Sequence, residues 1–435
     1  NTPHITPAPV PTEAVSEFPT CTAPAITDAP NHDNDSETVL TAEQISAMNA
    51  AFLQFPGESA GLFDLASFKN GISAKRLNAL IARGNLPSAN GYVGQTPLSA
   101  QQRNEILNNR ALDAVRNNSD VRFGFCVQRS DLRSVPFAQR VTSKPNDRFG
   151  DTLQESVVLQ NEPLAVLHES ADGKFLFVAA YFYVGWINSD SVALCSSFKQ
   201  WQALLAPEND FLVVTGSSFR LVSELELTMG MRLSLAEKPG TVKSVRGRMS
   251  YDNYIVNVPS RAADGSLKFI EALVPISRDV HIGYMPFTYS NVIRLADKTR
   301  GEIYGWGGML AARDCSALVM EIYRCFGIML PRNTSDLAKL PEKYAADVSS
   351  LSAEAKRETI LSQPAGVILF FPGHVMIYYG SDGNDLLCLS AAGKFAPVQS
   401  SATQNVYTVE VCSLDVRLSN GKTWLEAVEK IIRIG

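Results

Sequence analysis

Two residues far apart in the chain have the types and surroundings that acyl transfer needs. Cys315 follows Asp314, a good N-cap, so the thiol is expected in the first turn of a helix. There the positive end of the helix dipole and the free backbone N–H groups favour the thiolate, which is the nucleophilic form of cysteine. Of the five histidines, only His374 begins a strongly apolar strand downstream of this cysteine. A cysteine nucleophile with a histidine base is the pair that amide hydrolysis through a thioester requires.

The elements that would position this pair can be predicted from periodicity. In the stretch 304–326, a Gly-rich loop leads into a segment whose apolar residues recur at the spacing of one buried helical face. Cys325 lies in the same helix and is interpreted as core packing. The stretch 367–380 predicts two strands broken at Pro372 and Gly373, with Val375 and Ile377 alternating along the second. A helix that presents a cysteine to a small antiparallel sheet that presents a histidine is the expected arrangement.

Four short motifs around these residues resemble the NlpC-type cell-wall cysteine peptidases. The motifs are Y-G-W-G-G from Tyr304, R-D-C-S ending at Ser316, L-P-R ending at Arg332, and P-G-H-V-x-I-Y ending at Tyr378. Ala317 stands where the family usually has a glycine after D-C-S, and the motifs cover roughly the last third of the chain. The resemblance implies a papain-like α+β peptidase domain.

The resemblance leaves the third catalytic residue open. The family usually has a histidine on the strand after the base, but no histidine follows His374 in this chain. Folding the predicted hairpin brings Ser390 opposite His374, so Ser390 is the predicted partner. Cys388, a backbone group or a water are the alternatives. For the oxyanion, the backbone N–H of Cys315 and the hydroxyl of Tyr304 are the predicted donors.

The resemblance also implies a substrate. Family members with SH3-type domains before the peptidase are γ-D-glutamyl-L-diamino acid endopeptidases, which cut stem peptides between D-Glu and meso-diaminopimelate or Lys. A free N-terminal L-Ala is preferred, and Asp314 is expected to help bind its ammonium, with Tyr183 and Glu155 of the first barrel assisting. Ser316 and Ser335 match positions that touch the peptide. Simpler interpretations remain: a plain N-cap for Asp314, a core aromatic for Tyr183, and a solvated carboxylate for Glu155.

The remainder of the 435 residues predicts an α+β multidomain protein. Capping boxes at Thr41 and Ser99 begin helices, and Ser73 begins another. Short β-rich runs with turn signals then suggest small barrels, and V-G-W-I near residue 186 pairs with I-G-Y-M near residue 284 as a weak repeat. The expected parts are a Pro-rich flexible tail (1–36), a helical N-terminal region (37–119), two SH3-like barrels (120–204 and 205–295) and the NlpC-type peptidase domain (296–435). A closing helix is expected to carry Trp424, Leu425, Val428, Ile431 and Ile432 on one face.

Composition excludes several classes of function. A net charge of −5 argues against a nucleic-acid partner, and no run of about 18 apolar residues predicts a membrane span. The seven cysteines contain no C-x-x-C pair, which argues against a zinc site. No metal or organic cofactor is expected. The Pro-rich start resembles that of an exported protein whose signal has been removed, so a location in the periplasm or cell envelope is expected. The expected partners are murein peptides, and a monomer is the default expectation.

Two other classes of function stay open. The missing third histidine is compatible with a catalytically inactive peptidoglycan-binding or scaffolding protein, in which the barrels would be the working part. An acyltransferase on the same fold is the other alternative, and a deep apolar groove beside Cys315 would favour it.

Overall fold

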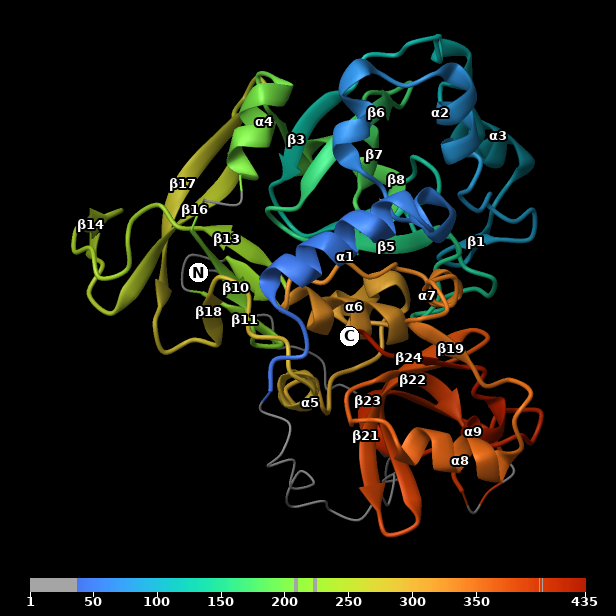
Figure 1. Ribbon diagram of the computed structural model, residues 1–435. Helices are drawn as coiled ribbons and strands as arrows, with labels where there is room; N and C mark the ends of the chain where they lie inside the picture. Colours follow the sequence, from blue (N-terminus) through green and yellow to red (C-terminus); the bar gives the residue numbers. More distant parts are fainter. Residues whose placement is uncertain (1–36, 207–209, 222–224, 399, 401) are drawn as a thin grey trace, which may run out of the picture.

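The computed structural model describes residues 37–206, 210–221, 225–398, 400 and 402–435. The Pro-rich tail predicted for residues 1–36 therefore lies outside the described residues. Figure 1 shows a first β domain with the N-terminal helices around it, a second β region beside it, and a C-terminal sheet on the opposite side of helix α6 (Cys315–Arg324).

The N-terminal region is helical, as predicted. Thr41 and Ser99 each form a complete capping box, and Ser73 caps the second helix through a bond from the backbone N–H of Arg76. These side chains satisfy backbone N–H groups that the first helical turn leaves unpaired. The elements are α1 (Ala42–Gln54), α2 (Ala74–Ile81), the small hairpin β1 (Tyr92–Val93) and β2 (Thr96–Pro97), and α3 (Ala100–Asn108).

A seven-stranded antiparallel sheet follows, in the order β5-β4-β8-β7-β6-β3-β9. Its apolar side chains form two clusters, one against the N-terminal helices and one that includes Met320 of α6. The predicted strands of this part are confirmed. The elements are β3 (Arg122–Cys126), β4 (Ser130–Arg133), β5 (Gln154–Val158), β6 (Pro163–Glu169), β7 (Phe175–Ala180), β8 (Tyr183–Asn188), β9 (Val192–Leu194) and α4 (Phe198–Leu204).

The second β region also has its strands where the sequence predicts them. Its described strands pair into a three-stranded sheet, β13-β10-β18, and three two-stranded ribbons around one apolar cluster. A second SH3-like barrel stays a prediction, because these strands are divided among four small sheets. The elements are β10 (Phe211–Val214), β11 (Ser218–Arg220), β12 (Glu226–Thr228), β13 (Arg232–Ser234), β14 (Ser244–Val245), β15 (Arg248–Met249), β16 (Asn253–Arg261), β17 (Leu267–Pro275) and β18 (Val280–Ile282).

The C-terminal part has the predicted α+β arrangement. Its antiparallel sheet has the order β19-β24-β20-β21-β22-β23, and α6 packs on β21 and β22. The strands are β19 (Ala345–Asp347), β20 (Ile368–Phe371), β21 (His374–Asp382), β22 (Asp385–Phe395), β23 (Gln404–Ser413) and β24 (Lys430–Ile432). The helices besides α6 are α5 (Tyr289–Asp297), α7 (Thr334–Leu337), α8 (Ala353–Leu361) and α9 (Trp424–Ala427).

The closing helix predicted from the sequence is wrong. Helix α9 ends at Ala427, and the chain continues as β24, which pairs with both β19 and β20. Ile431 and Ile432 are buried on opposite faces of that strand rather than on one face of a helix. β-Branched residues favour a pleated strand, and the central place in the sheet satisfies the backbone on both sides.

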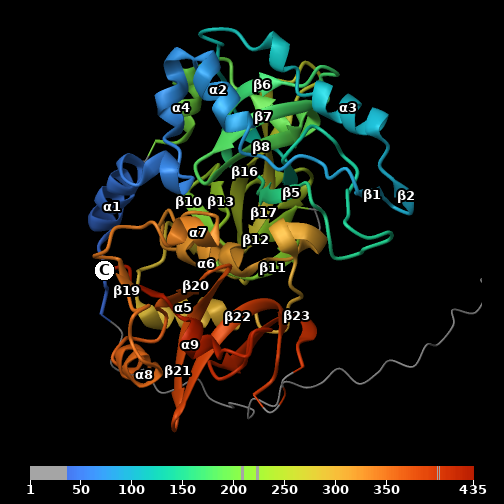
Figure 2. The ribbon, with the colours of Figure 1, turned by 90° about the vertical axis from the view of Figure 1, so that its right-hand side faces the viewer.

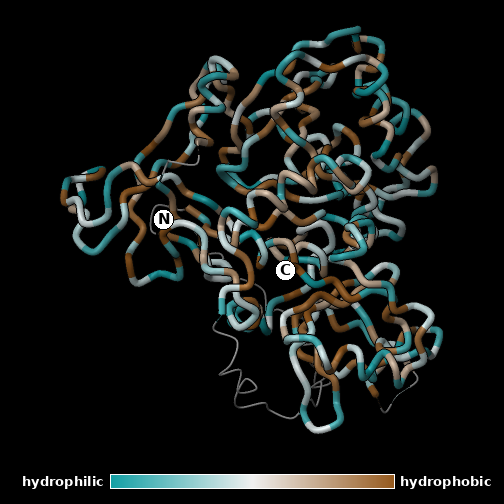
Figure 3. The backbone as a smooth tube through the Cα atoms, viewed as in Figure 1, coloured by the Kyte–Doolittle hydropathy of each residue, from teal (hydrophilic) through white to brown (hydrophobic). Residues whose placement is uncertain are grey.

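Helix α6 is the centre of the molecule. Figures 1 and 2 both show it between β5 of the first β domain and β22 of the C-terminal sheet. Residues Cys315 to Tyr323 are all buried, so the helix is covered all round and not on one face as its periodicity predicts. Leu318 and Ile322 belong to the C-terminal core, whereas Met320 packs in the barrel core. Figure 3 shows apolar segments along the strands of the C-terminal sheet and hydrophilic segments in the outer turns.

Candidate active site

Cys315 occupies the first turn of α6, as predicted. The side chain of its neighbour Asp314 accepts a hydrogen bond of 2.9 Å from the backbone N–H of Ala317, which fixes the N-cap. The thiol is buried, but it lines a cavity of about 1190 Å³. Its sulfur lies 3.8 Å from the Thr334 hydroxyl and beside the backbone N–H of Val375, the residue after His374. The first turn of the helix and the start of β21 therefore meet at the thiol.

His374 and Ser390 lie side by side across the β21–β22 hairpin. Nε2 of His374 is 2.7 Å from the Ser390 hydroxyl, so the predicted contact is present. Because Ser390 engages Nε2, Nδ1 is the ring nitrogen left for the thiol proton. Cys388, the alternative partner, instead packs in the core with its sulfur 3.7 Å from that of Cys412. The rings of Phe371 and Trp424 lie 5.2 and 5.0 Å from the imidazole and shield it from solvent.

Burial moves both titratable members of the pair toward their neutral forms. Desolvation lowers the pKa of His374 to about 4. Desolvation and the charge of Asp314 raise the pKa of Cys315, and the Val375 N–H, the Thr334 hydroxyl and Arg332 only partly oppose this. The thiolate expected from the helix dipole is therefore not the favoured resting form. The geometry instead suits a neutral imidazole that takes the proton while the thiol attacks.

Asp314 is held more tightly than a simple N-cap. Its carboxylate pairs with the Arg332 guanidinium through two bonds of 2.7 and 3.0 Å, and it also accepts from the backbone N–H of Gly307 at 2.9 Å. Arg332 further donates to the hydroxyl of Ser156 on β5, at 2.8 Å. Both side chains are nearly fully buried, so loss of either one would leave the other charge buried without a partner. Sequence reasoning included Arg332 in a motif but gave it no role.

Glu155 and Tyr183 of the first β domain line the same cavity as Cys315. The Tyr183 hydroxyl donates to a Glu155 carboxylate oxygen at 2.6 Å, and the Asn85 side chain lies 3.4 Å from the other oxygen. Burial and the charge of Glu155 raise the pKa of Tyr183, so the hydroxyl keeps its proton. The carboxylate is only half-buried and has capacity for a further donor.

The other three predicted residues also border the cavity. Ser316 is buried, and its hydroxyl accepts from Arg332 at 2.9 Å, whereas Ser335 is exposed. Tyr304 is half-buried, and no described protein group hydrogen-bonds to its hydroxyl. Burial and the neighbouring Cys315 raise the pKa of Tyr304, which keeps its hydroxyl a donor. Eight of the nine predicted site residues thus border one cavity, and the ninth, Ser390, contacts it through His374.

Comparison with known protein families explains this arrangement. Residues 301–412, which include Cys315, His374 and Ser390, match the sequence model of the NlpC/P60 family. The chain contains an NlpC/P60 domain. Residues 142–188 match an SH3 domain of the SH3b1 type, which identifies the first β domain. A comparison with curated protein sequences finds no match.

One solved structure agrees with this assignment at the level of the fold. An NlpC/P60 endopeptidase from Photobacterium damselae subsp. piscicida superposes with a TM-score of 0.70 at 16% identity, covering 93% of this chain and 95% of that one. An NlpC/P60 family protein from Bacillus cereus ATCC 10987 has a TM-score of 0.48 at 16% identity, covering 72% of this chain and 99% of that one. The first of these likenesses extends over the whole domain arrangement, not only over the NlpC/P60 domain.

The SH3 domain holds the Gly-rich loop of the NlpC/P60 domain. Sequence reasoning missed this contact. The side chain of Gln154 on β5 donates to the carbonyl oxygen of Gly307 at 2.9 Å, and Trp306 donates back to the Gln154 carbonyl at 3.2 Å. Arg129 donates to the carbonyl oxygen of Gly308 at 2.6 Å. Gly308 has φ of +85°, and a Cβ there would lie 2.6 Å from Val157. Only glycine allows this approach, so the SH3 domain shapes the active-site loop.

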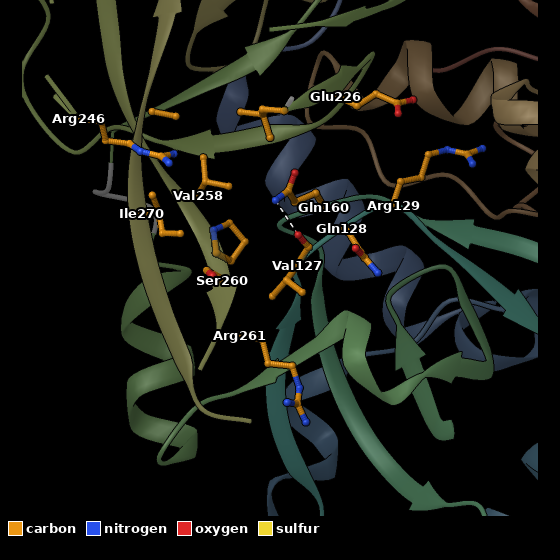
Figure 4. A pocket seen from close by; sticks show the side chains of 13 residues that line it. Val127, Gln128, Arg129, Gln160, Glu226, Arg246, Val258, Ser260, Arg261 and Ile270 are labelled. Atoms are coloured by element: carbon orange, nitrogen blue, oxygen red, sulfur yellow. Dashed lines mark hydrogen bonds between the residues drawn. The ribbon is translucent and has the colours of Figure 1, made fainter. Parts of the chain in front are cut away.

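A second crevice, of about 420 Å³, separates the SH3 domain from the second β region. Figure 4 shows Val258 and Ile270 on one wall and Val127 and Gln160, joined by a hydrogen bond, on the other. No cysteine or histidine lines this crevice, whereas Cys315 and His374 both line the larger cavity.

The described part of the chain lacks two other features. No group of three or more His, Cys, Asp or Glu side chains lies close enough to hold a metal ion. No helix there has the length and apolar character to cross a lipid bilayer.

Proposed function

We propose that this chain is a cysteine endopeptidase that hydrolyses the γ-D-glutamyl–L-diamino acid bond of peptidoglycan stem peptides with a free N-terminal L-Ala. The observation that carries the proposal is that one cavity is lined by Cys315, by His374, which Ser390 supports from behind, and by the half-buried carboxylate of Glu155. The NlpC/P60 and SH3b1-type matches support the same substrate class.

The proposed reaction begins with a neutral pair. As Sγ of Cys315 forms a bond to the γ-carbonyl carbon of D-Glu, Nδ1 of His374 takes the thiol proton. The oxyanion faces the backbone N–H of Cys315, at the start of α6, and the Tyr304 hydroxyl, from the loop before it. When the C–N bond breaks, His374 returns the proton to the departing amine. Water then attacks the thioester with His374 as base and releases L-Ala-D-Glu.

Glu155 is proposed as the principal acceptor for the N-terminal ammonium. Asp314 already receives N–H groups of Gly307, Ala317 and Arg332, so it has little capacity for another donor. Among the described residues, Glu155 instead receives only the Tyr183 hydroxyl and long contacts from Asn85. A charge-assisted hydrogen bond from the ammonium would use the remaining acceptor capacity of the Glu155 carboxylate. Asp314 would add negative potential nearby. An N-acetylated peptide would lose this contact.

The surroundings of the cavity do not favour the acyltransferase alternative. Charged and amide side chains, including Arg332, Lys394 and Asn405, line it together with the aromatic residues. These charged and amide groups suit a short peptide with charges at both ends, whereas a long acyl chain would gain nothing from them. Action on the cell wall requires export, so a location in the periplasm or cell envelope is part of the proposal.

The experiment compares L-Ala-γ-D-Glu-meso-diaminopimelate with its N-acetylated form, read by mass spectrometry beside the Cys315→Ala variant. We expect release of L-Ala-D-Glu from the free peptide only, and none with Cys315→Ala. Cleavage of both peptides would keep the peptidase but reject the ammonium site. If neither peptide is cleaved, although both bind, the inactive peptidoglycan-binding protein becomes the better description.

A further inference from the structure

The charges in the active-site cavity are unevenly partnered. Asp151 pairs with Arg133 at 2.5 Å, and Asp314 pairs with Arg332. Glu155 is held by the Tyr183 hydroxyl. Lys394 also lines the cavity, but it has no ion pair or side-chain hydrogen bond with any described residue. A cation without a partner in a substrate cavity indicates that the partner comes with the substrate.

Lys394 borders the cavity from the C-terminal end of β22, and its side chain is exposed there. The register between β22 and β23 shifts between Ala392 and Lys394. The next residue, Phe395, is buried against Trp424, which packs on His374. Lys394 pairs with Asn405 of β23, and Asn405 borders the same cavity. Four residues of strand span roughly 13 Å, so the ammonium lies beyond the catalytic pair and not against it.

Glu155 and Lys394 border the cavity from different domains. Glu155 is on β5 of the SH3 domain and Lys394 is on β22 of the C-terminal sheet, and Figures 1 and 2 show α6, which carries Cys315, between these two strands. The cavity therefore has an acceptor for a cation from one domain, the nucleophile on α6, and an exposed cation from the C-terminal sheet. A peptide with an ammonium before the scissile bond and a carboxylate after it matches this order.

We propose that Lys394 is a specificity-determining residue that binds the side-chain carboxylate of the diamino acid after the scissile bond, and so selects diaminopimelate over lysine. The inference rests on the proposed function. With the N-terminus held at Glu155 and the γ-carbonyl at Cys315, the departing residue extends toward β22. Diaminopimelate carries both an ammonium and a carboxylate at its far end, whereas lysine carries an ammonium alone. The ammonium of a substrate lysine would be repelled by the ammonium of Lys394.

The neighbours of Lys394 suit a long side chain that passes between them. Tyr407 on β23 stacks on Phe149 from the SH3 domain, with ring centroids 4.4 Å apart, and both rings border the cavity. Tyr407 has φ of +42°, a conformation that residues other than glycine seldom adopt. The stack gives the aliphatic part of the diamino acid an apolar wall, and Lys394 supplies the charge at its end.

The test measures kcat/KM for two peptides, L-Ala-γ-D-Glu-meso-diaminopimelate and L-Ala-γ-D-Glu-L-Lys, with wild type, Lys394→Met and Lys394→Glu. We expect wild type to prefer the diaminopimelate peptide about ten-fold, Lys394→Met to remove most of that preference, and Lys394→Glu to reverse it. Lys268→Met, an exposed lysine on β17 far from the cavity, is the matched control and should keep the wild-type ratio.

The outcomes separate this inference from the proposed function. If wild type cleaves neither peptide, the proposed function itself fails. If Lys394→Met loses the same factor on both peptides, the lysine binds the α-carboxylate of D-Glu, which both peptides share, and the selectivity role is rejected. An unchanged Lys394→Met would make this lysine an ordinary surface residue. Calorimetric binding to the Cys315→Ala form of each variant checks that the effect lies in binding.

Discussion

The Ser390 hydroxyl lies 2.7 Å from Nε2 of His374 and occupies the place where a charged partner would otherwise orient the ring. Ser390 is nearly fully buried and reaches no solvent. A hydroxyl fixes the direction of the imidazole but does not neutralise an imidazolium. Burial lowers the pKa of His374 to about 4, and the charge of Asp314 opposes this only in part.

Removing that hydroxyl should weaken the chemical step more than substrate binding. We expect Ser390→Ala to lower kcat about ten-fold with little change in KM, because the imidazole loses its fixed orientation but the ammonium site is intact. Steady-state kinetics on the free tripeptide measures both parameters. An unchanged kcat would mean that the rings of Phe371 and Trp424 alone hold the imidazole.

The pH profile should extend into mild acid. Because the pKa of His374 is lowered to about 4, the ring stays a neutral base above that pH, and kcat/KM should fall only as pH approaches 4. An ordinary histidine would lose activity near pH ~6.5. Ser390→Asp should raise the pKa of His374 and move this acid limb to higher pH. A limb near 6.5 in wild type would contradict the desolvation argument.

Loss of the charge on Glu155 should affect binding of the free N-terminus. We expect Glu155→Gln to raise KM about ten-fold or more, since a charge-assisted bond becomes a neutral one, while kcat changes little. Glu169→Gln, an exposed acid on β6 of the same domain, is the control and should behave as wild type. A Glu155→Gln variant with normal KM would assign the ammonium to Asp314 alone.

The buried Asp314–Arg332 pair should be important for stability. Arg332→Met leaves a buried carboxylate without its cation, so we expect a loss of about 3–5 kcal/mol in the free energy of unfolding. Arg357→Met breaks a pair with Asp415 that is about one-third exposed, and should cost about 1 kcal/mol or less. Urea denaturation of both variants compares the two sites. Equal losses would show that burial of the pair is unimportant.

Alanine substitutions at two glycines can separate the effect of the close approach between the SH3 domain and the Gly-rich loop from the effect of backbone strain. Gly308 and Gly421 both have φ of +85°, but a Cβ at Gly308 would meet Val157 at 2.6 Å, whereas one at Gly421 has no neighbour within 4 Å. Both alanine variants should lose about 1 kcal/mol from backbone strain. Only Gly308→Ala should also lose activity, because the loop that carries Tyr304 must move. Equal activity in the two variants would argue against a shaping role for the SH3 domain.

Much of this protein follows from local sequence. The N-caps at Thr41, Ser73, Ser99 and Asp314 begin helices where expected, because a side chain next to its own helix satisfies backbone groups without help from the fold. The pairing of Ser390 with His374 also follows from the sequence, since a short hairpin fixes its own register.

Tertiary structure decided what depends on distant partners. Arg332 reaches Ser156 of another domain, and burial of Cys315 opposes the thiolate that the helix dipole favours. The segment at Ile431 became a strand because β19 and β20 were there to pair with it. Lys394 carries no motif, and only the fold brings it to the same cavity as Glu155. Desolvation and pairing are properties of the surroundings, so no local pattern of residues records them.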